Sequence, residues 1–157
     1  MATESADIPG IHDATWRALE TGDALSGRRL AMRTLRWATA RDDHHARDMA
    51  HLQLAHADLL ESSFEPALIM SQKAGSELET LGDLARAVEA ICISAYCAIG
   101  RAQTGQAQAY LAKAREMAQS LPTSQGGASA RARVENYAGI AASWACEYAQ
   151  AREHFAL

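Results

Sequence analysis

The sequence is poor in residues that build β-sheets or interrupt helices. Among its 157 residues there are only two valines, Val88 and Val134, and three prolines, and aromatic residues make up 6%. β-Branched and aromatic residues favour strands, and proline inside a helix removes a backbone hydrogen bond. Alanine, the strongest helix former, occurs 35 times. This composition predicts an all-α fold.

Several features that would direct the chain to a membrane or to nucleic acid are missing. No run of apolar residues approaches the roughly 18 that a membrane span requires, and the N-terminal MATESADIPG has acidic residues but no apolar core. The formal net charge of −4 gives no general attraction to polyanions. The cysteines (Cys92, Cys97, Cys146) are odd in number and argue against structural disulfides. We therefore expect a cytoplasmic protein whose partners include neither nucleic acid nor membrane.

Turn-forming residues recur along the chain with a period of about 40 residues. They stand at Gly22-Asp23, at Ser62-Ser63-Phe64, at Ala102-Gln103-Thr104 and at Cys146-Glu147-Tyr148. A fixed period of this size is typical of stacked helical hairpins, in which each unit buries its apolar face against its neighbours. It predicts one repeat domain over residues 11–157, with repeats near 11–41, 44–81, 84–121 and 128–157.

Between these turns the sequence predicts helices of similar length. They cover residues 11–21, 24–41 and 44–61, then a segment from Ser63 to Leu81, then 84–101, 106–120, 128–145 and 149–157. Residues 1–10 are expected to form a disordered lead, and the breaker-rich stretch 121–127 a loop. The last helix ends after barely two turns, so we expect these residues to be a fragment of a longer protein.

The segment Ser-Ser-Phe-Glu-Pro-Ala-Leu at 62–68, with Phe64, Ala67 and later Ala74, resembles the second helix of the tetratricopeptide repeat (TPR). Tyr148 and Ala151 match the same piece of the motif. The resemblance covers roughly residues 11–157 and implies a right-handed α-α superhelix of stacked hairpins. The longer period is similar to a variant found in regulatory regions of bacterial signalling proteins, beside diguanylate cyclase or DNA-binding domains. The family resemblance therefore implies a protein–protein interaction scaffold rather than an enzyme.

The same resemblance implies that the first helix of each hairpin lines a concave groove, which holds a protein or peptide segment. The candidate partner-binding residues are His12, Trp16, Met49, Leu52, His56, Glu89, Tyr96, Arg133, Asn136, Ile140 and Trp144. Aromatic residues carry a large share of the binding energy in protein interfaces. The same side chains would also serve to pack helix against helix, and the sequence leaves both interpretations open.

A polar helix face offers an alternative function. His44, Asp48 and His51 are spaced i, i+4 and i+7, so they share one face and could ligate zinc or iron. A convincing site needs a further ligand from another helix, and the sequence shows no matching pattern. The competing interpretation is a solvated polar start of the helix, and the sequence predicts no bound metal or cofactor.

Five arginines give one helix a basic character, because no acidic residue occurs between Leu25 and Arg41. They are Arg28, Arg29, Arg33, Arg36 and Arg41. Such a face could dock an acidic partner or phosphates, or it could be a solvated surface balanced by Asp42, Asp43 and Glu61. The net negative charge of the chain favours the solvated surface.

The sequence contains no recognisable catalytic constellation, such as a glycine-rich phosphate loop or a nucleophile elbow. Its C-terminal repeat, in contrast, carries apolar residues without a polar capping helix, namely Ile140, Trp144, Tyr148 and Phe155. Exposed apolar patches mark interaction surfaces. We therefore expect a homodimer formed through the C-terminal repeat.

Overall fold

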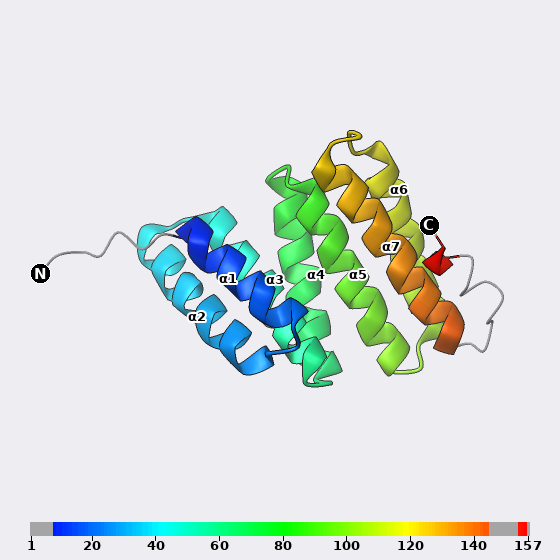
Figure 1. The fold of residues 1–157 in the computed structure, drawn as a ribbon, viewed down its shortest axis with the longest axis horizontal. Coiled ribbons are helices and arrows are strands. Elements are labelled where there is room, and N and C mark those ends of the chain that lie inside the picture. The colour runs from blue at the N-terminus through cyan, green and yellow to red at the C-terminus, as the bar shows by residue number, and fades with distance from the viewer. Residues whose placement is uncertain (1–7, 145–153, 157) are drawn as a thin grey trace, which may run out of the picture.

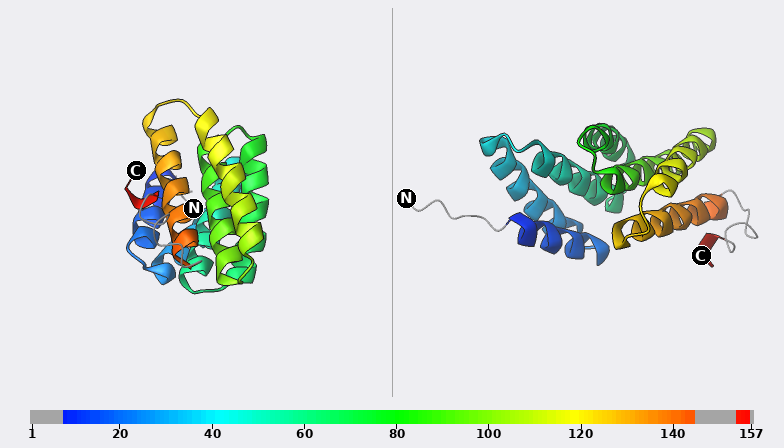
Figure 2. Two further views of the ribbon diagram at one scale, coloured as in Figure 1. Left: turned by 90° about the vertical axis from the view of Figure 1, so that its right-hand side faces the viewer. Right: turned by 90° about the horizontal axis from the view of Figure 1, so that it is seen from above.

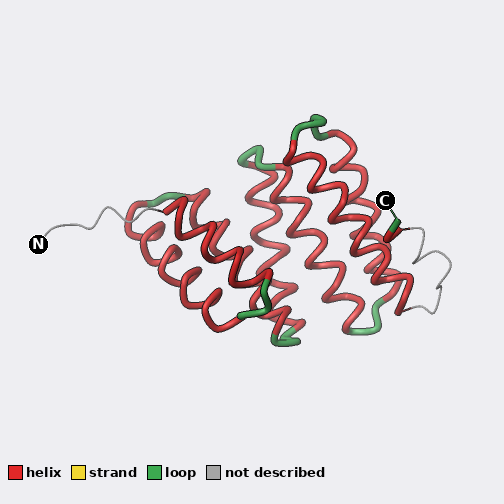
Figure 3. The backbone as a smooth tube through the Cα atoms, viewed as in Figure 1, coloured by secondary structure: helices red, strands yellow, loops and turns green. Residues whose placement is uncertain are grey.

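The computed structural model of the chain describes residues 8–144 and 154–156, and its regular elements there are all α-helices (Figures 1 and 3). The helices are α1 (Ile8–Glu20), α2 (Ala24–Arg41), α3 (His44–Leu60), α4 (Phe64–Thr80), α5 (Leu84–Gly100), α6 (Thr104–Ser120) and α7 (Gln125–Trp144). The prediction of an all-α, repeat-like fold is confirmed. The predicted helix 149–157 falls largely on residues outside the described part.

The first five turns share one geometry, which repeats every 20 residues. In each turn one residue takes a left-handed backbone conformation, with φ between 54° and 82°, at Gly22, Asp42, Ser62, Gly82 and Ala102. The N–H of the following residue then donates to the carbonyl five residues earlier, as Asp23 does to Ala18 (2.8 Å) and Gln103 does to Ala98 (2.8 Å). This hydrogen bond closes the C-terminus of a helix. The predicted 40-residue period is therefore two helix–turn units of equal length.

The residue after each left-handed position begins the next helix. Asp23, Asp43 and Asp83 each accept a hydrogen bond from the backbone N–H three residues on, and so cap α2, α3 and α5. Aspartate is among the best N-cap residues because its carboxylate satisfies an N–H that has no partner inside the helix. The left-handed residue thus ends one helix and the residue after it starts the next, which keeps the connections between helices short.

The regular spacing stops at Pro122, which occupies the position where the next left-handed residue would fall. The proline ring holds φ near −65° and disfavours a helical conformation in the preceding residue. Leu121 is accordingly extended, with φ −73° and ψ 147°. The connection to α7 is therefore longer than the other turns.

The predicted loop 121–127 is too long, because α7 begins at Gln125. Gly127 lies inside this helix and is buried. A Cβ atom at this position would stand 2.0 Å from the carbonyl oxygen of Pro122. The glycine is there because the preceding loop passes close to the helix, and it does not interrupt the helix.

The prediction of a disordered lead over residues 1–10 is wrong for its last three residues. α1 begins at Ile8, whose side chain is buried. Pro9 lies in the first turn of the helix, where its missing N–H has no intrahelical acceptor to lose. Residues 1–7 lie outside the described part of the chain.

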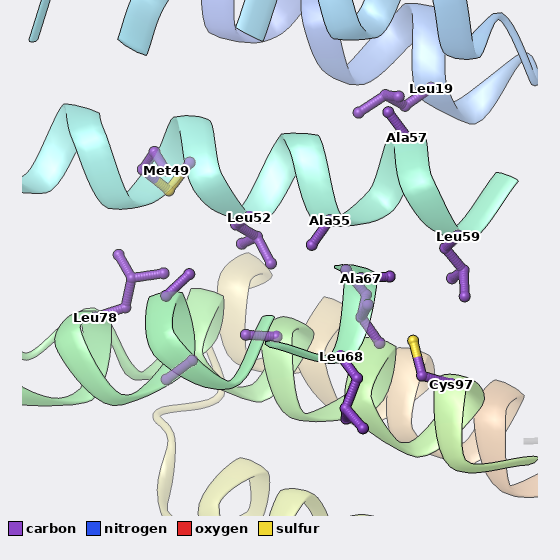
Figure 4. Packing of buried hydrophobic residues seen from close by; sticks show 14 of the residues in the cluster. Leu19, Met49, Leu52, Ala55, Ala57, Leu59, Ala67, Leu68, Leu78 and Cys97 are labelled. Atoms are coloured by element: carbon purple, nitrogen blue, oxygen red, sulfur yellow. The ribbon is translucent and has the colours of Figure 1, made fainter. Parts of the chain in front are cut away.

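Small residues let the helices approach closely. A Cβ atom on Gly27 of α2 would stand 2.4 Å from Leu19 of α1, and one on Gly100 of α5 would stand 2.5 Å from the Phe64 ring. Alanines and leucines of α1, α3, α4 and α5 fill a continuous core (Figure 4). The many alanines therefore serve packing as well as helix propensity.

Cys92 and Cys97 of α5 are buried and are not joined in a disulfide. Burial raises the pKa of both thiols to about 12, which keeps them protonated and unreactive at neutral pH. Within the described residues this agrees with the predicted lack of structural disulfides. Cys146 lies outside the described residues.

Candidate functional site

The odd-numbered helices form one side of a curved row. α1 packs against α3, α3 against α5, and α5 against α7. In the right-hand view of Figure 2, α1 and α7, at the two ends of the row, lie on the same side of α3 and α5. The row is therefore curved, and we call its inner side the concave face.

Trp16 of α1 contacts both α3 and α5 across the concave face. Its indole ring meets the His56 ring of α3 edge to face, with ring centres 5.8 Å apart. The guanidinium carbon of Arg86, on α5, lies 5.2 Å from the centre of the Trp16 ring. The backbones of α1 and α5 are not neighbours, because α3 lies between them. The cation–π contact between Trp16 and Arg86 therefore spans the concave face.

Arg86 also forms an ion pair with the buried carboxylate of Glu89. Arg86 Nη1 donates to Glu89 Oε2 at 2.8 Å, and Arg133 Nη1 of α7 lies 2.5 Å from Glu89 Oε1. The Glu89 side chain is only 3% exposed. A buried carboxylate is strongly unfavourable unless it is paired, and here two guanidinium groups from different helices pair with it. Trp16, His56, Arg86, Glu89 and Arg133 form one connected group, which we call the concave cluster.

Three polar atoms of the concave cluster form no hydrogen bond within the described part of the chain. Trp16 Nε1 and His56 Nδ1 are buried and form no hydrogen bond with any described residue. Glu89 Oε1 faces Arg133 in an ion pair whose geometry is not that of a hydrogen bond. Buried polar atoms in folded proteins nearly always have a hydrogen-bond partner. These atoms are enclosed by the protein, so the groups of the concave cluster that a bound segment can reach are the partly exposed side chains of Arg86 and Arg133.

Burial also governs the protonation of this region. It lowers the pKa of His56, an effect that the nearby Glu89 carboxylate partly opposes. Burial lowers the pKa of His12 as well, whose Nδ1 lies 3.2 Å from Gln53 Oε1. Both histidines are therefore held neutral in the folded chain at neutral pH. The fixed charges of the concave cluster are those of Arg86, Glu89 and Arg133.

The predicted partner-binding residues divide by exposure. Buried ones are Trp16, Met49, Leu52 and Glu89; partly exposed ones are His12, His56, Tyr96, Arg133 and Ile140; exposed ones are Asn136 and Trp144. Leu52 and Met49 belong to the hydrophobic core. Tyr96 meets Tyr137 of α7 edge to face, with ring centres 5.9 Å apart. The helix-packing interpretation therefore holds for Leu52, while Arg133 and Asn136 keep surface for a partner.

Arg86 is the functional candidate that the repeat pattern missed, because it falls between the expected groove positions. One signal in the sequence points to it. Arg86 and Glu89 are spaced i, i+3 on a predicted helix, a spacing that brings opposite charges together on one face. The contact with Trp16 could not be read from spacing, since it depends on the curvature of the whole row.

A separate cavity of about 380 Å³ lies at the C-terminal end of the array. Ala107 and Leu111 of α6, Ala138 and Trp144 of α7, and His154 are among its lining residues. Trp144, which is 64% exposed, is the predicted partner-binding residue found there. The structure thus places Trp144 away from the concave cluster.

The proposed metal ligands do not converge. His44 Nδ1 lies 2.7 Å from Arg47, and the exposed His44 ring is also near Asp42. Asp48 is buried, and its Oδ1 is 3.5 Å from His51 Nδ1. Within residues 8–144 and 154–156, no three His, Cys, Asp or Glu side chains are placed to share a metal ion.

The arginines of α2 are in two different environments. Arg28 pairs with Asp58 at 2.8 Å and with Glu61 at 2.5 Å. Arg29, Arg33 and Arg36 are exposed and form no ion pair with any residue that the structure describes. Among the acidic residues expected to balance this face, Glu61 pairs with Arg28, while Asp42 lies beside His44 and Asp43 caps α3. None of them forms an ion pair with Arg29, Arg33 or Arg36 among the described residues.

None of the helices in the described part of the chain is long and apolar enough to cross a membrane. No protein-family model matches the sequence, and a search of curated proteins finds no similar sequence.

Proposed function

We propose that this chain is a non-enzymatic scaffold that binds a protein segment on its concave face. The observation that carries the proposal is the concave cluster, in which two guanidinium groups hold a buried carboxylate and still keep exposed surface on this face. The side chains of Arg86 and Arg133 are 38% and 27% exposed. A segment lying along the concave face can pair with both arginines.

The chemistry of the site favours binding over catalysis. The guanidinium groups stay charged at all physiological pH values, and the thiol of Cys92 is held protonated by burial.

On the basis of the TPR resemblance, we further propose that the chain is the regulatory region of a bacterial cytoplasmic signalling protein.

A peptide-display selection tests the binding proposal. Random peptides of about 16 residues are selected on the immobilised protein, and the dissociation constant of the best peptide is measured by fluorescence anisotropy. Replacing Arg133 by Ala should weaken binding about tenfold, because a charge-assisted hydrogen bond contributes roughly 1.5–3 kcal/mol. Lys73→Ala, at an exposed site on α4, is the matched control and should leave the affinity unchanged. Equal effects of the two substitutions, or a selection that enriches no peptide, would contradict the proposal.

A further inference from the structure

A second surface of the molecule has a composition that the concave face does not explain. Three exposed arginines of α2, Arg29, Arg33 and Arg36, share one side of the helix with Leu25 and Met32. Leu25 is 77% exposed and Met32 is 38% exposed. Because successive helix residues are about 100° apart, the five side chains fall within an arc of roughly 100°. We call this surface the α2 outer face.

The α2 outer face points away from the rest of the protein. The buried residues of α2 are Gly27, Ala31, Thr34 and Ala38. On a helical projection these four lie opposite the five residues of the outer face. Figure 1 shows α2 at the N-terminal end of the array, with α1 and α3 as its neighbours. The outer face is therefore turned toward solvent, with all five of its residues exposed.

The positive charge of this face is largely uncompensated by the described residues: Arg29 attracts the Asp23 carboxylate, but none of the three arginines forms an ion pair. Asp23, the nearest acidic residue before it, accepts a hydrogen bond from the Ser26 backbone N–H and caps the helix. Asp58 and Glu61 hold the neighbouring Arg28. Three guanidinium groups therefore remain unpaired beside two exposed apolar side chains, in a chain whose net charge is −4.

We infer that the α2 outer face binds an acidic amphipathic segment of a partner protein. Its carboxylates would pair with Arg29, Arg33 and Arg36, and its apolar residues would cover Leu25 and Met32. Guanidinium groups match carboxylates in two-point hydrogen bonding. From Leu25 to Arg36 the helix rises about 16 Å, which fits three turns of a partner helix.

The charge of the whole chain favours a short acidic segment over an extended polyanion. A bilayer surface or a nucleic-acid duplex would also approach the acidic remainder of the protein and be repelled by it. A partner helix contacts only the basic face. The exposed Leu25 and Met32 also need an apolar counterpart, which a phosphate backbone does not offer.

The test uses the full chain and a synthetic 21-residue helical peptide with Glu along one face and Leu at every seventh position. Its affinity is measured by isothermal titration calorimetry at low ionic strength. The double variant Arg29→Glu/Arg36→Glu should bind about tenfold more weakly, because two ion pairs are replaced by repulsion. The control Arg17→Glu/Lys73→Glu makes the same change in net charge at two exposed sites on α1 and α4. It should bind within twofold of the wild type.

A third variant separates the apolar part of the contact from the charge. Leu25→Ser removes an exposed side chain and should weaken binding about threefold without changing the circular dichroism melting curve. The inference is overturned if the charge variant and its control lose affinity equally, or if the peptide does not bind. It is also overturned if phosphatidylserine vesicles or a DNA duplex bind more tightly than the peptide. Failure here would leave the concave face untouched, since none of these residues belongs to it.

Discussion

The guanidinium group of Arg86 lies over the indole ring of Trp16, 5.2 Å from its centre, although 70 positions separate the two residues. This contact joins the first hairpin to the third across α3. Trp16 is at the same time almost completely buried, with 8% of its surface exposed. It therefore supports the core on one side and the concave cluster on the other.

Replacing Trp16 by Ala should lower the free energy of unfolding by about 3–5 kcal/mol, because a large buried side chain is lost and a cavity remains. Trp144→Ala is the matched control. Its side chain is 64% exposed, so the substitution should cost less than about 0.5 kcal/mol in dilute solution. Urea unfolding monitored by far-UV circular dichroism measures both. Similar losses for the two variants would show that Trp16 does not contribute to the core as described.

The repeated turn geometry predicts opposite effects for two small substitutions. Ala102 has a φ of 58°, a conformation that costs an L-residue about 1 kcal/mol or more and costs glycine little. Ala102→Gly should therefore stabilise the protein by about 1 kcal/mol. Gly82→Ala should destabilise it by a similar amount, because the alanine would be held at a φ of 82°. A Cβ there meets no atom within 4 Å, so no steric clash adds to this backbone cost. A loss of stability in Ala102→Gly would be incompatible with the turn described.

Much of the fold could be predicted from these turns, and the limits of that prediction are physical. Gly22, Gly82 and the aspartates after them are recognisable turn and cap signals. Apart from the start of α1, which lies three residues before the predicted one, the ends of the helices beside them were predicted to within a residue or two. Alanine is not a residue type that favours a left-handed conformation, and the turn at Ala102 was predicted from the repeat period rather than from its residue type. Likewise, Gly127 looks like a helix breaker in sequence, and only the close approach of Pro122 explains its place inside α7.

The candidate site was harder to predict than the fold. The repeat register identified Trp16, His56, Glu89 and Arg133 as residues of one face, and the structure brings these four together. The repeat register could not distinguish Leu52, which is wholly buried, from predicted positions whose side chains keep exposed surface. That distinction depends on how closely neighbouring helices pack, and hence on side chains from other repeats.

Acidification should destabilise the protein before its carboxylates titrate. Burial lowers the pKa of His12, His51 and His56 from 6.5 in the folded chain. Below about pH 6.5 the unfolded chain thus binds more protons than the folded one. The free energy of unfolding therefore decreases as the pH is lowered. The urea midpoint should be constant above about pH 7 and should decrease as the pH falls below about 6.5. His56→Gln should reduce this slope, and a midpoint that rises on acidification would contradict the argument.

The exposed apolar residues at the C-terminal end predict self-association. Trp144 and Phe155 are 64% and 54% exposed, and Ile140 is partly exposed beside them. Tyr148, which completes the predicted patch, lies outside the described residues. We expect a homodimer with a two-fold contact through this end at high protein concentration. Light scattering should report a dimer mass for the wild type and a monomer mass for Trp144→Glu. A monomer mass for both would exclude this dimer.

The concave face can be tested directly through the indole N–H resonances of the three tryptophans. Trp16 lies in the concave cluster, Trp37 on α2 and Trp144 at the C-terminal cavity, so each reports on a different surface. A peptide selected on the protein is titrated into the ¹⁵N-labelled chain, and the three indole signals are followed. We predict that the Trp16 signal shifts with a saturable dependence on peptide concentration while that of Trp37 stays in place. A peptide that binds and shifts only Trp37 or Trp144 would contradict the assignment of the binding site to the concave face.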